Sequence, residues 1–131
     1  MYKYYNPNRV SENTGDCVIR AITKATNQSW DKVYWDLCDI GFIMGDWGNS
    51  NKVWNSYLID CGFIRKVIPN TCPDCYTVKD FCKDNPGGIF ILATGSHVVA
   101  IVNGNYFDSW DSGNEVPIFY YERRVQYGIH E

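Results

Sequence analysis

The stretch GSHVVAIVNGNYFDSWD, residues 95–111, predicts a β-hairpin and thereby the fold of the C-terminal half of the chain. At its centre, Asn103-Gly104 is the strongest two-residue signal for a type I′ turn between two strands. The run before the turn is rich in β-branched residues, and the run after it is rich in aromatic residues. Both compositions favour strands. We therefore expect an antiparallel pair formed by residues 97–102 and 105–110.

The turn also predicts the register of this pair. With two residues in the turn, Val102 pairs with Asn105, and Asp108 lies diagonally opposite His97 on the same face. A three-residue loop would bring Asp111 to His97 instead, but Asn-Gly favours the two-residue turn and therefore Asp108. The predicted face comprises His97, Val99, Ile101, Tyr106, Asp108 and Trp110.

Outside the hairpin, the chain shows both helical and strand patterns. After an extended arm over residues 1–14, apolar residues recur at helical spacing in stretches that begin after Asp16, Ser29 and Ser50. Gly41 is expected to end the second helix, and a short fourth helix follows Thr77. Further strands are predicted at 64–68, 89–94 and 116–121. Helices first and an antiparallel sheet second define the α+β class.

Composition restricts the classes of protein to consider. The 131 residues are sufficient for a single domain with a hydrophobic core, and 45% of them are hydrophobic. The net charge is −3 and the basic residues are scattered, which argues against a nucleic-acid partner. No apolar run is long enough for a membrane span, and the N-terminus lacks the apolar core of a signal peptide. We therefore expect a cytoplasmic protein.

The six cysteines need separate explanations, because free thiols are the default in the cytoplasm. Cys38 and Cys61 lie on the apolar stripes of their helices, and Cys82 follows Phe81 near the end of the fourth helix, so all three are predicted to be core residues. The pair Cys72 and Cys75 has the spacing of a zinc half-site and of a redox motif, but lacks a second ligand pair. A plain loop is the favoured interpretation of that pair.

Cys17 differs from the other cysteines, because it lies in the first turn of a predicted helix. Unpaired backbone N–H groups and the helix dipole favour an anion there, so they lower the pKa of a thiol. His97, oriented by Asp108, could accept its proton. The second histidine, His130, is next to the last residue and is not expected to take part. We therefore predict that Cys17 is a nucleophile, His97 its base and Asp108 the carboxylate that orients the base.

These residues resemble the papain-like cysteine peptidase superfamily, especially its compact bacterial and bacteriophage members. The segments that carry the resemblance are 14–21, 95–102 and 108–111. It implies that Cys17 is the nucleophile, His97 the base and then the acid, and Asp108 the third member of a catalytic triad. Many members have Gln six residues before the cysteine. Ser11 stands there in this chain, so Asn13 and the backbone N–H of Cys17 are the expected oxyanion-hole donors.

The expected function is that of a thiol hydrolase, a cysteine peptidase or amidohydrolase acting on a peptide or protein, with no metal and no cofactor. Trp47 and Trp110 are candidates to line a substrate cleft, although core positions would suit them equally. One alternative is a peptidoglycan hydrolase similar to the cysteine–histidine amidohydrolase/peptidase (CHAP) and NlpC families. Another is a non-catalytic, phage-type protein-binding module. The sequence does not predict the oligomeric state.

Overall fold

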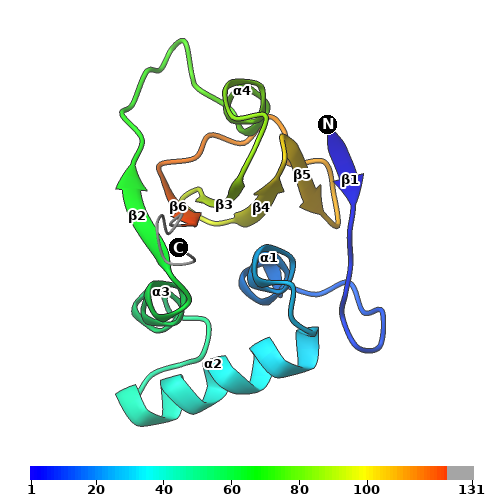
Figure 1. Ribbon diagram of the computed structural model, residues 1–131, viewed down its shortest axis with the longest axis vertical. Coiled ribbons are helices and arrows are strands. Elements are labelled where there is room, and N and C mark those ends of the chain that lie inside the picture. Colours follow the sequence, from blue (N-terminus) through cyan, green and yellow to red (C-terminus); the bar gives the residue numbers. More distant parts are fainter. Residues whose placement is uncertain (124–131) are drawn as a thin grey trace, which may run out of the picture.

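The computed structural model describes residues 1–123, which contain four helices and one six-stranded mixed sheet (Figure 1). The predicted α+β class is confirmed, whereas His130 lies outside the described residues. In chain order, the elements are β1 (Tyr2–Tyr4), α1 (Cys17–Thr26), α2 (Trp30–Met44), α3 (Asn51–Asp60), β2 (Phe63–Val67), α4 (Val78–Asp84), β3 (Ile89–Ala93), β4 (Val98–Val102), β5 (Asn105–Asp108) and β6 (Phe119–Arg123).

The central hairpin has the predicted register. Val102 pairs with Asn105 across the turn between β4 and β5. Asn103 and Gly104 have φ angles of 50° and 78°, and a type I′ turn requires positive φ at both central positions. The second strand is shorter than predicted, because β5 ends at Asp108 and the chain then turns away.

The sheet has one parallel pair, so the prediction of a purely antiparallel sheet is wrong. The strand order is β1-β5-β4-β3-β6-β2, and only β1 runs parallel to its neighbour. Tyr2–Tyr4, expected to be part of an extended arm outside the sheet, form this edge strand beside β5. A parallel pairing between segments so far apart has no turn sequence to indicate it, which explains why the sequence pattern missed it.

Both faces of the sheet are covered. Figure 1 shows α1, α2 and α3 on one side of the sheet and α4 on the other. Val98 and Ala100 belong to the apolar core on the side of α1, whereas Val99 and Ile101 pack with α4. Strands buried on both faces are apolar at consecutive positions, which accounts for the unbroken apolar sequence of β4.

Helix α2 is longer than predicted. It continues past Gly41 to Met44 and ends at Gly45, whose φ of 72° is the left-handed conformation that favours glycine at a C-cap. Gly41 serves a different purpose, because the backbone of the following loop packs directly on it. A Cβ atom at Gly41 would lie 2.7 Å from the carbonyl oxygen of Asp46 and 3.0 Å from the amide nitrogen of Gly48.

This contact makes Gly41→Ala a test of the fold. Alanine normally stabilises an exposed helix by up to about 1 kcal/mol relative to glycine. Here overpacking opposes that gain, and such strain costs about 1–3 kcal/mol. We expect a net loss, measured as a lower midpoint of thermal or urea unfolding. Gly87→Ala is the control, since nothing lies within 4 Å of its added Cβ atom; an unchanged or raised midpoint for Gly41→Ala would contradict the packing argument.

The cysteines follow the predictions only in part. Cys82 is buried and Cys61 packs, half-buried, against the core, but Cys38 is exposed. The buried stripe of α2 is the narrow row Val33, Leu37 and Gly41, and Cys38 lies beside it. Cys72 and Cys75 are joined by a disulfide, in a loop rather than in a helix or strand, which corrects the expectation of free thiols.

No helix among residues 1–123 is long and apolar enough to cross a membrane.

Candidate active site

A cavity of about 290 Å³ lies between the beginning of α1 and the beginning of β4. Cys17, the first residue of α1, lines it together with His97, which directly precedes β4. The remaining lining residues come from α1 and the turn before it, the start of α3 and the loop before it, the β3–β4 loop, β4 and β6. They are Gly15, Val18, Asn49, Asn51, Trp54, Thr94, Gly95, Ser96, Val98 and Phe119.

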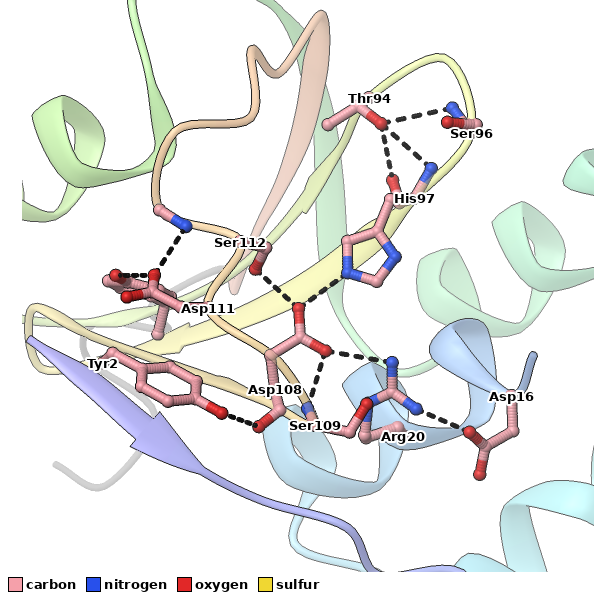
Figure 2. Close-up of polar contacts among 12 residues, drawn as sticks. Tyr2, Asp16, Arg20, Thr94, Ser96, His97, Asp108, Ser109, Asp111 and Ser112 are labelled. Atoms are coloured by element: carbon pink, nitrogen blue, oxygen red, sulfur yellow. Dashed lines mark hydrogen bonds and ion pairs between the residues drawn. The ribbon is translucent and has the colours of Figure 1, made fainter. Parts of the chain in front are cut away.

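The His97 ring connects the thiol to a carboxylate. Its Nε2 atom lies 2.6 Å from Oδ2 of Asp108 (Figure 2). The other ring nitrogen, Nδ1, remains for the thiol of Cys17, which lines the same cavity and whose pKa is lowered by its interaction with His97. Thr94 fixes the backbone of His97, because its Oγ1 atom accepts a hydrogen bond of 2.9 Å from the His97 amide. The structure thus brings together the three residues predicted to form the triad.

The hydrogen bonds of this group favour an ion pair. Burial by itself would raise the pKa of the Cys17 thiol, but its interactions with His97 and with the backbone of Val98 lower the pKa below its usual value. Burial would likewise lower the pKa of His97, but its bonds with Asp108 and Cys17 raise it to about 9. A lowered thiol pKa and a raised imidazole pKa are the two directions that favour a thiolate beside a protonated imidazole.

Asp108 is completely buried and surrounded by donors. The Ser112 hydroxyl donates to Oδ2 at 2.6 Å, and the amide of Ser109 donates to Oδ1 at 2.8 Å. Figure 2 shows the carboxylate between the ring of His97 and the guanidinium of Arg20. Burial would raise the pKa of Asp108, but its bonds with His97 and Ser112 outweigh burial and lower it. The carboxylate therefore stays ionised although no water reaches it.

Arg20 is the residue of this network that sequence reasoning missed. Only 4% of it is exposed, and its Nη2 atom lies 3.0 Å from Oδ1 of Asp108. Its Nη1 atom lies 2.5 Å from Asp16, so one guanidinium connects two buried carboxylates. The (i, i+4) spacing of Asp16 and Arg20 was the available signal, but such pairs are common on exposed helix surfaces.

Asp16 has a different use from the one predicted. It occupies the N-cap position of α1, but its side chain accepts no hydrogen bond from the helix backbone. Its two oxygens instead bind Arg20 and the indole N–H of Trp30, the latter at 2.9 Å. The N–H groups at the start of α1 are therefore not capped by this carboxylate.

The alternation of side chains between the two faces of the hairpin does not continue to the ends of its strands. Tyr106 packs with α4, as the predicted face requires, but His97 and Asp108 contact Cys17 and Arg20 of α1. His97 precedes β4 and Asp108 is the last residue of β5. Neither residue is therefore held by sheet hydrogen bonds to neighbouring strands on both sides. The shared-face prediction is thus correct in the middle of the hairpin and wrong at its open end.

Asp111, the alternative partner of His97, lies elsewhere. Its Oδ1 atom accepts hydrogen bonds from the hydroxyl of Tyr106 at 2.5 Å and from the amide of Gly113 at 3.1 Å. The side chain of Asp111 points away from His97 in Figure 2. The preference for Asp108, derived from the Asn-Gly turn, agrees with this geometry.

The other predicted site residues have diverse positions. The ring of Trp110 contacts that of His97 in a tilted arrangement, with 4.7 Å between ring centroids, and Trp110 is 44% exposed. Trp47 is 80% exposed and lines a cavity that adjoins the one at Cys17. Asn13 is exposed and is not among the residues that line the Cys17 cavity. Asn49 and Asn51 do line it, and no sequence pattern indicated them.

Among residues 1–123, no group of three or more His, Cys, Asp or Glu side chains could hold a metal ion. The chain matches no protein-family model, no curated protein and no solved structure. The chemical interpretation of the site therefore rests on its own geometry.

Proposed function

We propose that this protein is a cysteine peptidase or amidohydrolase of papain-like architecture, with Cys17, His97 and Asp108 as its catalytic triad. The observation that carries the proposal is the chain of contacts from a thiol at a helix N-terminus, through one imidazole, to a buried carboxylate 2.6 Å away. A nucleophile next to a base that is itself oriented by a third group is the arrangement that covalent acyl transfer requires.

The reaction follows from these positions. The Cys17 thiolate attacks the carbonyl carbon of an amide and forms a C–S bond. As the C–N bond breaks, His97 gives its proton to the leaving amine. Water then attacks the thioester while His97 accepts one of its protons, and the C–S bond breaks to release the acid. Asp108 stabilises the His97 ring in the steps in which it is protonated, and keeps Nδ1 directed toward sulfur.

The negative charge on the carbonyl oxygen needs donors at the cavity. The backbone N–H of Cys17 is in the first turn of α1, where helix N–H groups lack intrahelical partners. Asn51 is the second donor that we assign to this role, in place of Asn13. Its amide oxygen accepts a hydrogen bond from the indole of Trp54 at 3.1 Å, which fixes the side chain and leaves the amide nitrogen to donate.

Selective alkylation tests the proposed nucleophile. At pH 6, iodoacetamide should modify Cys17 faster than Cys38, although Cys38 is the more exposed thiol. The pKa of Cys17 is lowered, whereas burial raises the pKa of both Cys61 and Cys82. Peptide mapping by mass spectrometry measures the four rates. Equal rates for Cys17 and Cys38 would contradict an activated nucleophile.

Product analysis tests the reaction. Incubation with a peptide library derived from a proteome should give new termini with the wild type and none with Cys17→Ala. Cys61→Ala is the matched control and should retain activity, since it removes a half-buried thiol that lines neither the cavity at Cys17 nor the one at Trp47. Digestion of purified cell walls would identify the peptidoglycan alternative. A chain that cleaves neither and alkylates slowly at Cys17 would be a binding module instead.

A further inference from the structure

A second cavity, of about 400 Å³, adjoins the one at Cys17. It lies where the start of α1 and the middle of α2 meet the loop after α2. Gly15, Val18 and Asn49 line both cavities, so the two are neighbouring parts of one depression. Whatever fills the second cavity therefore lies next to the proposed nucleophile.

The walls of this second cavity are largely apolar. Val18, Ile19 and Leu37 contribute aliphatic side chains, and Tyr34 and Trp47 contribute aromatic ones. Its remaining lining residues are Thr14, Gly15, Asp16, Cys38, Gly48 and Asn49. No basic residue lines it.

Asp16 is the one ionisable carboxylate of the lining, and its charge is already paired. Its oxygens bind Arg20 at 2.5 Å and Trp30 at 2.9 Å. A cationic ligand group would have to compete with a buried guanidinium for it. The cavity therefore offers neither a free anion nor a cation to a charged ligand group, but does offer apolar area.

Trp47 exposes apolar surface that a ligand group in the cavity would cover. Four fifths of this indole is exposed, and its backbone is held by an amide hydrogen bond of 2.7 Å to the side chain of Asp46. A large apolar group in the cavity would cover part of the ring and remove apolar surface from water.

We infer, on the basis of the proposed function, that this cavity is a specificity subsite for a large apolar side chain, aromatic or branched aliphatic, of the peptide substrate. The side chain would belong to a residue flanking the scissile bond, because the subsite and the nucleophile share Gly15, Val18 and Asn49 as walls. Substrates with small or charged residues at that position would react more slowly.

The test uses two series of chloroacetamides with the same reactive group. One carries a phenyl ring on linkers of one to four methylenes, and the other carries a hydroxyl on the same linkers. Each rate at Cys17 is divided by the rate of the same compound with glutathione. We expect the best phenyl compound to exceed its hydroxyl partner by about tenfold or more, the discrimination that a hydrophobic pocket achieves.

Cys38 provides the matched pair of variants, since it is exposed on α2 and lines the subsite. Cys38→Ser leaves the cavity open and should keep the preference, whereas Cys38→Trp fills it and should abolish the preference. Trp47→Ala, which removes one wall, should reduce the preference several-fold. Iodoacetamide carries no large apolar group, so dividing each chloroacetamide rate by the iodoacetamide rate of the same variant removes any change in the reactivity of the Cys17 thiol itself.

The outcomes separate the subsite from the proposed function. Fast iodoacetamide labelling of Cys17, with equal rates for the two series or with the preference intact in Cys38→Trp and Trp47→Ala, would overturn the subsite alone. Slow labelling of Cys17 by iodoacetamide in the wild type would overturn the activated nucleophile, and the subsite with it.

Discussion

Replacing His97 with alanine will slow the alkylation of Cys17 at pH 6 by about tenfold or more. Burial raises the pKa of this thiol, and it is mainly the hydrogen bond and charge of His97 that lower it. Without the imidazole, burial remains and the pKa of Cys17 rises. An ordinary thiol, with a pKa of about 8.5, is less than about 1% thiolate at pH 6. The lower intrinsic nucleophilicity of a low-pKa thiolate offsets part of the wild-type advantage.

The pH profile gives a second readout of the same substitution. Because the pKa of Cys17 is lowered in the wild type, its thiolate persists as the pH falls below the range of an ordinary thiol. In His97→Ala, the rate should instead climb with pH and level off only at or above that range. Ser96→Ala is the control, since Ser96 lines the same cavity but does not belong to the proposed triad. Superimposable profiles of His97→Ala and the wild type would refute the ion pair.

Arg20→Met will cause the largest loss of stability among single polar substitutions at the site, about 3–5 kcal/mol at pH 7. The substitution keeps a long side chain but leaves the carboxylates of Asp16 and Asp108 without their shared cation. An uncompensated buried charge is costly, whereas the intact pair contributes little by itself. Urea unfolding monitored by tryptophan fluorescence measures the difference.

The pH dependence of this loss has a definite sign. The folded-state pKa of Asp108 is lowered, so its interactions contribute stability above the unfolded pKa of about 3.9, and this contribution disappears as the pH falls through the folded pKa. The difference between Arg20→Met and the wild type should therefore be complete at pH 7 and shrink below about pH 4.

An exposed ion pair provides the comparison. Lys32 bonds to Asp36 at 2.6 Å, but 58% of the lysine side chain is exposed, so Lys32→Met should cost at most about 1 kcal/mol. Equal losses for the Arg20 and Lys32 substitutions would show that burial of the Arg20 network does not determine its energy.

The part of the fold that the sequence predicted depends on local signals. Asn103-Gly104 determined the turn, the register and the choice of Asp108, because φ is positive at both residues. The end of α2 was mispredicted because a glycine in a helical pattern resembles a C-cap, and only the tertiary structure shows that Gly41 is required for a loop contact. β1 was missed for the same reason: its partner lies a hundred residues away.

The candidate site shows the same division. A cysteine after Gly15-Asp16 and a histidine before an apolar strand carried enough chemistry to be selected from the sequence. Arg20 and Asn51 were not selected, because their roles depend on how far α1 and α3 lie from the sheet. Helical spacing specifies which face a residue occupies, but not which distant carboxylate or cavity that face meets.

The edge strand β1 has a consequence for the carboxylate of the proposed triad. Tyr4 pairs with Asp108, the amide of Tyr5 donates to the Asp108 carbonyl at 2.8 Å, and the Tyr2 hydroxyl donates to the same oxygen at 3.2 Å. The first five residues thus hold the backbone of Asp108 from the side opposite the cavity. Proteolytic trimming of this arm, or displacement of β1 by a foreign strand, would therefore disturb the contact of Asp108 with His97 without blocking the cavity at Cys17.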